Sequence, residues 1–408
     1  MLIVHKYGGT SVGDPERIRR VAQRVVRQKQ AGHELVVVVS AMGDTTDDLV
    51  ELAAKVSPRG RKEHPREMDM LLTAGERITM ALTAMAIRDL GVEAISLTGS
   101  QAAIITDESH TGAKIQEIRA TRIREELDNG RVVIVAGFQG VSRAKEVTTL
   151  GRGGSDTTAV ALAAALEAER CDIYTDVDGV YTADPRKVDG ARRIRVIDYQ
   201  EMVELATSGA QVMHPRAVEI GARYGVPIRV LSSFRDDDDE GTLITKKERT
   251  MESLQLTGLA CEGSHVQVVV RGLPGGMDAT TEVLSRVADQ KISVDMVTQA
   301  DTPDGKRQLQ LTVREDSVDE TIAICEEVAK RGGGTVHAQR GLTRVSMVGS
   351  GMHNSPGVYA RAFKALHGAG VEVHAVGSSA ITITVLVDTK NEEKTVRVLH
   401  EAFDFGNQ

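Results

Sequence analysis

The chain has 408 residues, of which 41% are hydrophobic and 26% are charged, a composition typical of a globular enzyme. This length predicts two or three domains, at roughly 100–200 residues per domain. A net charge of −8, the absence of Trp and an aromatic content of 3% argue against a nucleic-acid-binding protein, which needs a cationic surface and stacking rings.

The cysteines and the apolar segments indicate the cellular compartment in which we expect the protein. Cys171, Cys261 and Cys325 are far apart in the sequence and form no CxxC pair, so we expect neither a zinc site nor a disulfide framework. The apolar stretch at residues 2–4 is too short for a signal sequence. The longest apolar runs, such as Ala159–Leu166, fall short of the ~18 residues that a membrane span requires. We therefore expect a soluble, cytoplasmic protein with no membrane partner.

Short β-branched segments alternate with longer amphipathic segments up to residue 235. This alternation predicts an α/β fold with a mainly parallel sheet and helices on both faces. In such sheets, ligands bind at the carboxyl ends of the strands. The expected strands are Leu2–His5, Leu35–Ser40, Ala94–Leu97, Val132–Phe138, Asp172–Thr175 and Ile228–Leu231. The expected helices are Pro15–Gln30, Thr46–Lys55, Arg66–Leu90, Arg119–Asp128, Thr157–Ala168 and His214–Tyr224.

The pattern changes after an acidic block at Arg235–Gly241, which we interpret as a solvated loop rather than a metal site. Two βαββαβ units then follow each other, an internal duplication over residues 264–340 and 341–408. The second unit ends at its second helix and so lacks a sixth strand. We expect Leu254–Ala260, within the linker 236–263, to complete its sheet. The expected strands are Val266–Val270, Ile292–Val297, Leu309–Val313, Val345–Val348, Val371–Val376 and Ile381–Val387; the helices are Ala279–Asp289, Val318–Lys330, Val358–Leu366 and Glu392–Phe403.

The first glycine-rich loop, residues 7–11, joins the first strand to the first helix. Its glycines allow a ligand to approach the backbone closely, and the amides at a helix start favour an anion such as phosphate. The loop matches neither the Walker A motif nor GxGxxG, and a glycine pair by itself is more typical of a structural turn. Lys6, at the carboxyl end of the strand, adds an ammonium that can reach a transferred phosphoryl group.

The second glycine-rich loop, residues 151–158, is more specific. It has three glycines in four residues and leads into an Ala-rich helix that Ser155 or Asp156 could cap. Arg152 is harder to explain by structure alone, because the helix dipole disfavours a cation at a helix start. An anionic substrate at this position would account for it.

A third loop, residues 174–181, follows a later strand and mixes hydroxyl and carboxylate groups, with Arg186 a few residues beyond. These groups suit the base, ribose and phosphates of a nucleotide. The alternative interpretation is a turn rich in Asp.

Taken together, these segments resemble aspartate kinases of the amino-acid kinase family. The C-terminal duplication is similar to the paired ACT domains that bind amino-acid effectors in that family. The resemblance implies an amino-acid kinase domain over residues 1–235 and ACT-like units over 264–340 and 341–408. The matching segments are Lys6–Ser11, Val39–Gly43, Thr73–Arg77, Thr149–Asp156, Tyr174–Asp176 and Val212–Pro215.

The resemblance also implies a reaction: transfer of the γ-phosphoryl of ATP to the side-chain carboxylate of L-aspartate, giving 4-phospho-L-aspartate on the way to threonine, methionine and lysine. A carboxylate with a reference pKa of ~3.9 is already a nucleophile at pH 7, so no general base is needed. Catalysis then consists of aligning two anions and offsetting their repulsion. Mg²⁺ is expected to arrive with ATP, bridging its β- and γ-phosphates without direct protein ligands.

Residue roles follow from the same resemblance. Lys6 would stabilise charge on the transferred phosphoryl group, and Asp156 would orient Lys6. Arg152 would pair with the α-carboxylate of aspartate, and Glu76 would hold the α-ammonium. The remaining acceptor-pocket residues would be Ser40, Thr46, Gly153, Gly154 and Ser155. ATP would be held by Tyr7, Gly8, Gly9, Thr175, Asp176, Tyr181, Arg186, Gln211 and Val212, and the effector by Asp278, Ala279, Asp295, Gln299, Ser355, Pro356, Gly357 and Val358.

Three positions depart from the family pattern. Gln211 stands where many members carry Lys and cannot supply a cation, so the affinity for ATP would depend more on Arg186. The first ACT-like unit lacks the acidic residue that usually precedes Pro274, and Ala380 stands where Glu is common. Recognition of the effector is therefore expected to differ, with threonine favoured over lysine.

Two questions stay open at this stage. The rival functions are another kinase of the family, acting on glutamate, N-acetylglutamate or UMP, and a non-catalytic amino-acid sensor. The assembly is either a homo-oligomer joined through the ACT-like units or an α2β2 complex, whose smaller subunit would start internally near Met251.

Overall fold

A sheet of buried, mainly parallel strands is the centre of the first of two units in the computed structural model, which describes residues 1–235, 239–247, 255–352 and 357–405. The first unit comprises Met1–Tyr181, Arg193–Thr207 and Gln211–Arg249, and the second comprises Thr182–Arg192, Ser208–Ala210 and Thr250–Gln408. Two short segments that the sequence places in the first domain, 182–192 and 208–210, are thus grouped with the C-terminal region.

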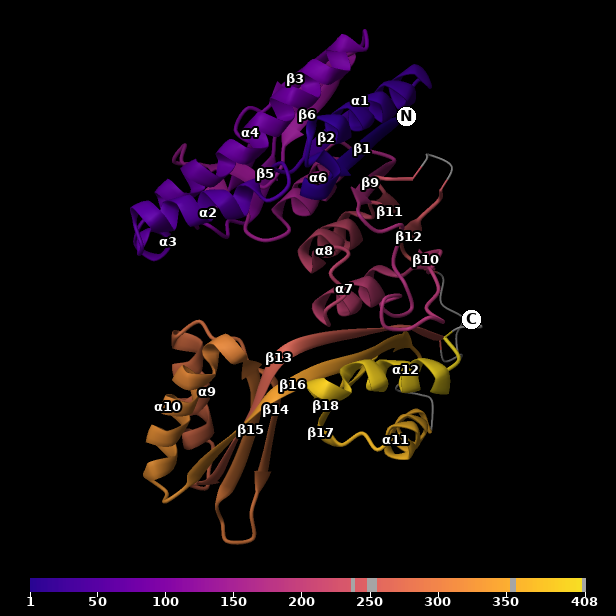
Figure 1. Ribbon diagram of the computed structural model, residues 1–408. Coiled ribbons are helices and arrows are strands. Elements are labelled where there is room, and N and C mark those ends of the chain that lie inside the picture. The colour runs from indigo at the N-terminus through magenta and orange to yellow at the C-terminus, as the bar shows by residue number, and fades with distance from the viewer. Residues whose placement is uncertain (236–238, 248–254, 353–356, 406–408) are drawn as a thin grey trace. The chain divides into compact units, whose positions relative to one another are not determined.

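The large sheet of the first unit has the strand order β10-β12-β11-β9-β1-β2-β6-β3 (Figure 1). Its neighbouring strands are parallel except β11 and β12, which are antiparallel. This confirms the α/β class. The strands are β1 (Leu2–Tyr7), β2 (Glu34–Val39), β3 (Ala94–Leu97), β6 (Val132–Ala136), β9 (Arg170–Thr175), β10 (Val196–Ile197), β11 (Ile228–Ser232) and β12 (Thr242–Ile244).

Helices cover this sheet on both faces because its strands bury side chains on both faces. The residues Ile3, Leu35 and Ile134 belong to one core with the helices α1 and α4. Their neighbours Val4 and Val36 point the other way and are also fully buried, and α6 contacts β1, β2 and β9. The helices are α1 (Pro15–Gln30), α2 (Thr45–Val56), α3 (Gly60–Glu63), α4 (Pro65–Asp89), α5 (Thr121–Asp128), α6 (Gly154–Ala165), α7 (Tyr199–Thr207) and α8 (Pro215–Tyr224), with the 3-10 helix η1 (Gly9–Val12).

A second, four-stranded sheet in the first unit has the order β5-β4-β7-β8. Its short strands β4 (Ile104–Thr106), β5 (Ile115–Ile118), β7 (Gln139–Ser142) and β8 (Val147–Thr149) were not expected from the sequence. Each has three or four residues, several of them polar, so none shows a long β-branched run. The sheet is important for the site because β8 leads directly into the second glycine-rich loop.

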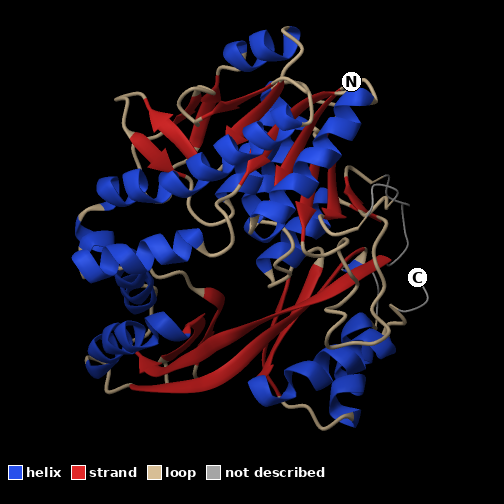
Figure 2. Cartoon of the chain, turned by 45° about the horizontal axis from the view of Figure 1, so that its top comes forward, coloured by secondary structure: helices blue, strands red, loops and turns tan. Residues whose placement is uncertain are grey.

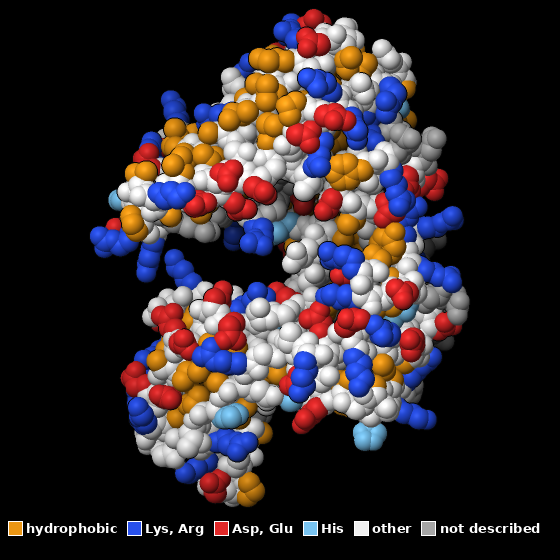
Figure 3. Space-filling model, viewed as in Figure 1, with side chains coloured by type: hydrophobic (Ala, Val, Ile, Leu, Met, Phe, Trp, Pro, Cys, Tyr) orange, Lys and Arg blue, Asp and Glu red, His pale blue; other side chains and the backbone are white. Residues whose placement is uncertain are grey.

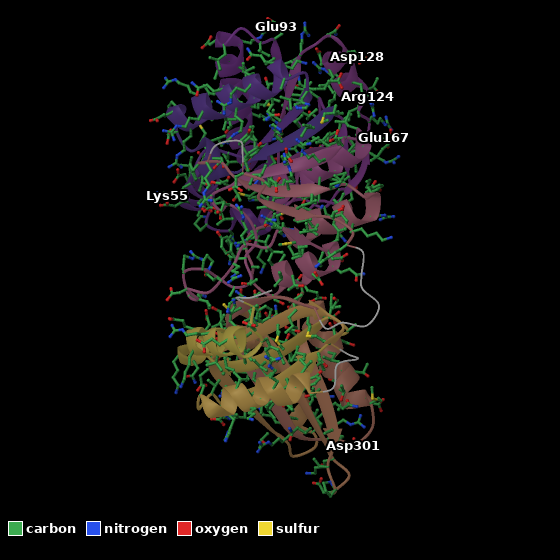
Figure 4. All side chains as sticks on the ribbon, turned by 90° about the vertical axis from the view of Figure 1, so that its right-hand side faces the viewer. Lys55, Glu93, Arg124, Asp128, Glu167 and Asp301 are labelled. Carbon is green, nitrogen blue, oxygen red and sulfur yellow. The ribbon has the colours of Figure 1, made fainter. Side chains whose placement is uncertain are left out.

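Helix α4 passes the length and composition test for a membrane span, but half of its apolar window is buried inside the protein, and core helices pass the same test. Its outward residues Ile78, Leu82 and Met85 are exposed, and hydrophobic side chains gather over this part of the unit in Figure 3. Farther along the chain, Arg124 on α5 donates to Leu166 O at 3.0 Å, next to Glu167 at the end of α6 (Figure 4).

The second unit is built on one antiparallel sheet with the order β14-β15-β13-β16-β18-β17. The two longest strands, β13 and β16, run side by side through it (Figure 2). Helices α9 and α10 lie at one end and α11 and α12 at the other. The elements are β13 (Gln255–Leu273), α9 (Asp278–Asp289), β14 (Asp295–Asp301), β15 (Arg307–Arg314), η2 (Glu315–Ser317), α10 (Val318–Lys330), β16 (Thr335–Ser350), α11 (Val358–Gly368), β17 (Val373–Ser378), β18 (Thr382–Asp388), η4 (Thr389–Asn391) and α12 (Glu392–Ala402).

The duplication explains why β13 and β16 are long. The first half of β13, from Leu256 to Cys261, pairs with Val345–Gly349, and its second half pairs with β15 and with the first half of β16. Each long strand therefore pairs with neighbours in both halves of the sheet, and the described part of the expected strand, Gln255–Ala260, lies in β13 and pairs with β16. Asp301, at the end of β14, pairs with Arg307 Nε at 2.7 Å across the β14–β15 hairpin (Figure 4).

Candidate active site

Loops at the carboxyl ends of β1, β2 and β6 and the first turn of α6 surround a cavity of about 280 Å³ in the first unit. Parallel strands present these ends on the same edge of a sheet, which explains how residues far apart in the sequence meet here. The cavity is lined by Lys6, Gly9, Ser40, Ala41, Gly43, Thr46, Glu76, Phe138, Gly151, Arg152, Gly153, Gly154, Ser155 and Asp156.

Lys6 and Asp156 form an ion pair at the base of the cavity. Lys6 Nζ lies 2.7 Å from Asp156 Oδ1, and both side chains are about nine-tenths buried. Lys6 is near the end of β1, and Asp156 is in the first turn of α6. Both elements are packed in the core, so the Lys6 ammonium is held next to the N-terminus of α6. A helix N-terminus stabilises a bound anion.

Glu76 is a carboxylate with an incomplete set of partners. The residue is only 3% exposed, and its Oε1 accepts a hydrogen bond from Ala41 N at 3.2 Å. Its Oε2 is buried and has no hydrogen-bond partner among the described residues. Burial raises the pKa of Glu76 to about 7. A buried acceptor without a partner is costly, so Oε2 is available to accept a hydrogen bond from a donor such as a ligand ammonium.

The first glycine-rich loop differs in part from the expectation. The Gly8 amide donates to Tyr174 O at 3.3 Å and so is already engaged. The Tyr7 ring is fully buried and stacks on Tyr174 at 4.7 Å, so only the backbone of Tyr7 could face a nucleotide. Gly9 lines the cavity, and a Cβ there would lie 3.0 Å from Ala41 O.

The second glycine-rich loop presents Arg152 at the cavity. Arg152 is exposed, between Gly151 at φ +75° and Gly153 at φ +68°. The helix α6 begins at Gly154, with Gly153 as its N-cap. Ser155 and Asp156 are therefore inside the first turn rather than capping it, a correction to the cap expected from the sequence. Their side chains are left to face the cavity.

Replacing Gly153 with alanine should disturb this loop. A Cβ at Gly153 would lie 2.2–2.5 Å from the side chain of His214, in addition to the cost of a positive φ for alanine. We expect the KM for the acceptor substrate to rise about tenfold, because displacing a binding group by ~1 Å has large effects. Gly91→Ala is the matched control, since Gly91 has φ +80° and nothing within 4 Å of its Cβ position. Steady-state kinetics showing equal KM values for both variants would contradict this explanation.

The residues expected to hold ATP are not all brought together. Thr175 ends β9, next to β1, and its Oγ1 donates to Asp176 Oδ1 at 3.1 Å. The Tyr181 hydroxyl donates to Asp178 Oδ1 at 2.9 Å. Gln211 and Val212 precede α8; Gln211 is exposed and Val212 is half-buried. None of these is among the described residues that line the cavity.

Arg186 belongs to the second unit, where it is 88% exposed and paired with Asp184 at 3.0 Å.

The residues expected to bind an effector lie in the second unit. Asp278 and Ala279 begin α9, and Thr280 Oγ1 donates to Gln299 Oε1 on β14 at 3.0 Å. Asp295 is already ion-paired with Arg344. In the second copy, Gly357 is the N-cap of α11 at φ +94°, Val358 is its first residue and is buried, and Ser355 and Pro356 fall outside the described residues.

The cavity is also lined by residues for which we predicted no role. Ala41 and Gly43 lie in one of the motifs that carried the family resemblance, whereas Phe138 carried no signal. Phe138 follows β6 with φ +67°, and its amide donates to Thr158 Oγ1 at 3.2 Å. Among the described residues, no group of three or more His, Cys, Asp or Glu side chains is placed to hold a metal ion. All three cysteines carry free thiols.

Comparison with known proteins gives consistent matches along the chain. A model of the amino acid kinase family matches residues 1–232, and a model of the ACT domain matches residues 345–403. The sequence is 47% identical over 407 residues to the aspartokinase of Geobacillus stearothermophilus, covering 100% of this chain and 98% of that protein. It is 49% identical over 414 residues to the aspartokinase of Mycolicibacterium smegmatis, covering 99% and 96% respectively.

Among solved structures, the fold is similar to that of E. coli aspartokinase III in complex with aspartate and ADP, in its R-state. The two chains are 27% identical, the TM-score is 0.83, and the match covers 99% of this chain and 100% of that one.

Proposed function

This chain belongs to the aspartokinases of the amino acid kinase family, and from that premise we propose how the described cavity transfers the γ-phosphoryl of ATP to L-aspartate, giving 4-phospho-L-aspartate. Aspartate would lie between Glu76, which binds its α-ammonium, and Arg152, which binds its α-carboxylate. The side-chain carboxylate would then point towards Lys6. Ser40, Thr46, Gly153, Gly154 and Ser155 would complete the acceptor pocket.

The observation that carries this proposal is the unpartnered, buried Oε2 of Glu76 in a cavity that also exposes Arg152. An amino acid supplies an ammonium and a carboxylate on one carbon, and it would satisfy both groups at once. Glutamate, N-acetylglutamate and UMP are less suitable: glutamate is one methylene longer, and the other two lack a free α-ammonium. The relative from E. coli with aspartate and ADP supports the same choice of ligands.

Lys6 and Asp156 are the proposed catalytic pair. The carboxylate of aspartate attacks the γ-phosphorus while the bond to the β–γ bridging oxygen breaks and ADP leaves. The Lys6 ammonium stabilises negative charge on the phosphoryl oxygens. Asp156 holds Lys6 in place through the 2.7 Å ion pair. ATP would bind along Gly9, Thr175, Asp176, Tyr181, Gln211 and Val212, with the backbones of Tyr7 and Gly8 nearby. Mg²⁺ accompanying ATP would offset the phosphate charge, and Asp156 would help to organise the metal-bound phosphates.

The ACT-like units are the proposed site of feedback control by an amino acid. Asp278 and Ala279 begin α9, and Thr280 in the same turn donates to Gln299 on β14, the strand that also carries Asp295. Gly357 and Val358 lie at the start of α11 in the second copy. Threonine is the proposed effector and lysine the alternative. From the family resemblance we also propose domain boundaries after residues 235, 263 and 340. We propose a cytoplasmic location for the protein.

Two assemblies remain proposals: a homo-oligomer joined through the ACT-like units, and an α2β2 complex with a smaller subunit that starts near Met251. Met251 lies outside the described residues. The intact masses of natively purified protein distinguish the two, because only the second gives two species.

Release of ADP tests the function directly. The assay uses ATP and Mg²⁺ with L-aspartate, L-glutamate or UMP, and repeats the aspartate reaction with threonine, lysine or both. We expect turnover with aspartate alone and inhibition by threonine. Turnover with glutamate or UMP but not aspartate would overturn the proposed acceptor. Inhibition by lysine alone would overturn the proposed effector and leave the acceptor assignment intact.

A further inference from the structure

Asp69 is a fully buried carboxylate on α4, about two helical turns before Glu76 and on the same face of the helix. It accepts hydrogen bonds from Thr149 Oγ1 at 2.6 Å, from His110 Nδ1 at 2.7 Å and from Thr111 N at 3.1 Å. These partners come from two different segments: Thr149 ends β8, and the other two belong to the loop between β4 and β5. Asp69 therefore ties both segments to α4.

Arg216 on α8 joins the same two segments from another helix. One guanidinium nitrogen donates to Leu150 O at 2.8 Å, and the other donates to Ala113 O at 2.7 Å. Leu150 follows Thr149, and Ala113 lies two residues after Thr111. A direct hydrogen bond from Ala113 N to Thr149 O, at 2.9 Å, joins the two segments between these contacts. The base of the second glycine-rich loop is thus held on both sides.

The loop that carries Arg152 rests on this base. A Cβ added to Gly151 would lie 3.1 Å from Thr111 O, so the loop packs closely on the 110–113 segment that Asp69 and Arg216 hold. Neither residue is among the described residues that line the cavity. Their carboxylate and guanidinium contact the backbone and side chains behind Arg152, and so they can act on a substrate only through the loop.

We propose that Asp69 and Arg216 are positioning residues that fix Arg152 relative to Glu76, and thereby set the spacing for the α-carboxylate and α-ammonium of the amino-acid substrate. Helix α4 carries Glu76 and also Asp69, which holds the base of the Arg152 loop. One helix therefore positions both groups that would contact the substrate. Charge-assisted hydrogen bonds to a buried carboxylate are strong and directional. Because a ~1 Å displacement can change rates about a hundredfold, rigid support of Arg152 has a direct effect on binding. This inference rests on the proposed role of Arg152.

The test compares Asp69→Asn and Arg216→Met with wild type in the full-length enzyme, by steady-state kinetics for aspartate and for ATP. Each variant should raise the KM for aspartate at least tenfold, leave the KM for ATP within twofold and change kcat less than threefold. Arg216→Lys, which keeps one charged donor, should recover part of the loss. Because both residues hold the same loop, the double variant should show less than the product of the single effects.

Thr83→Ala is the matched control, since Thr83 is also fully buried on α4 but donates only to Thr79 O within the helix. It should leave both KM values unchanged. Thr149→Val replaces Asp69→Asn if that variant does not fold, because it removes one donor to Asp69 and keeps the side-chain shape.

Arg152→Ala separates the two proposals. A raised KM for aspartate in Arg152→Ala, with unchanged values in folded Asp69→Asn and Arg216→Met, overturns the positioning inference alone. An unchanged KM in Arg152→Ala overturns the proposed role of Arg152 and the inference with it. Equal rises in the KM for aspartate and for ATP would indicate a general structural role and would also overturn the inference.

Discussion

Replacing Lys6 with alanine is expected to lower kcat by about 10³-fold while changing the KM values for aspartate and ATP less than threefold. The ammonium is buried against Asp156, and in the proposed mechanism it faces the phosphoryl group, where charge develops. Removing one preorganised electrostatic contact to a transition state typically costs 10²–10³ in kcat. Because the interaction is stronger in the transition state than in the ground state, the loss should appear in kcat rather than in KM.

Lys55→Ala is the control for the loss of a lysine. Lys55 is 68% exposed on α2, and its ion pair with Glu51 at 2.7 Å is a surface contact of small value (Figure 4). Its kcat should match that of the wild type. Lys6→Ala also leaves the Asp156 carboxylate buried without its partner, so thermal unfolding must first show that the variant is folded. A folded Lys6→Ala enzyme with the kcat of the wild type would remove Lys6 from the mechanism.

Local signals in the sequence predicted the regular part of the fold. Helix α1 runs over Pro15–Gln30 as expected, because Asp14 caps it through Arg17 N and Pro15 takes the first helical position. The parallel strands were visible as runs of buried β-branched residues. The carboxyl-end rule pointed to Lys6, and the family resemblance added Ser40 and Asp156; all three line the cavity.

Long-range polar contacts could not be predicted in the same way. The partners of Asp69 come from residues 110, 111 and 149, and nothing near Asp69 in the sequence indicates them. The small sheet that holds those partners has strands of three or four residues, too short for a clear period. The bond from the Gly8 amide to Tyr174 O is equally non-local. The sequence motifs thus identify groups that can touch a substrate, and the tertiary fold is needed to identify what holds them.

Replacing Glu76 with glutamine is expected to raise the KM for aspartate about a hundredfold at pH 8 and to make the protein more stable there. Truncating or neutralising one partner of a buried charged pair costs about 2–5 kcal/mol in binding. Burial raises the pKa of Glu76 to about 7 in the unliganded enzyme. Only the carboxylate can bind an ammonium, so the KM of the wild type should fall as pH rises from 6 to about 7 and then level off. The variant should show no such dependence.

The stability effect has a definite sign. The folded-state pKa near 7 lies above the value of ~4.3 in an unfolded chain, so the folded state binds this proton more tightly. Stability of the wild type therefore falls between about pH 4.5 and 7, by about 4 kcal/mol in total. Glutamine removes that cost, so the melting temperature of Glu76→Gln should exceed that of the wild type at pH 8 and match it near pH 4.5.

Glu167→Gln is the control, because this glutamate is exposed and lies away from the cavity at the end of α6 (Figure 4). It should leave both the KM for aspartate and the melting temperature unchanged at either pH. A higher melting temperature for Glu76→Gln with an unchanged KM would keep the burial cost and reject the ammonium site. A raised KM with an unchanged melting temperature would mean that other groups compensate the buried charge of Glu76. Both effects together require one carboxylate that is kept buried, at a cost in stability, because aspartate needs its charge.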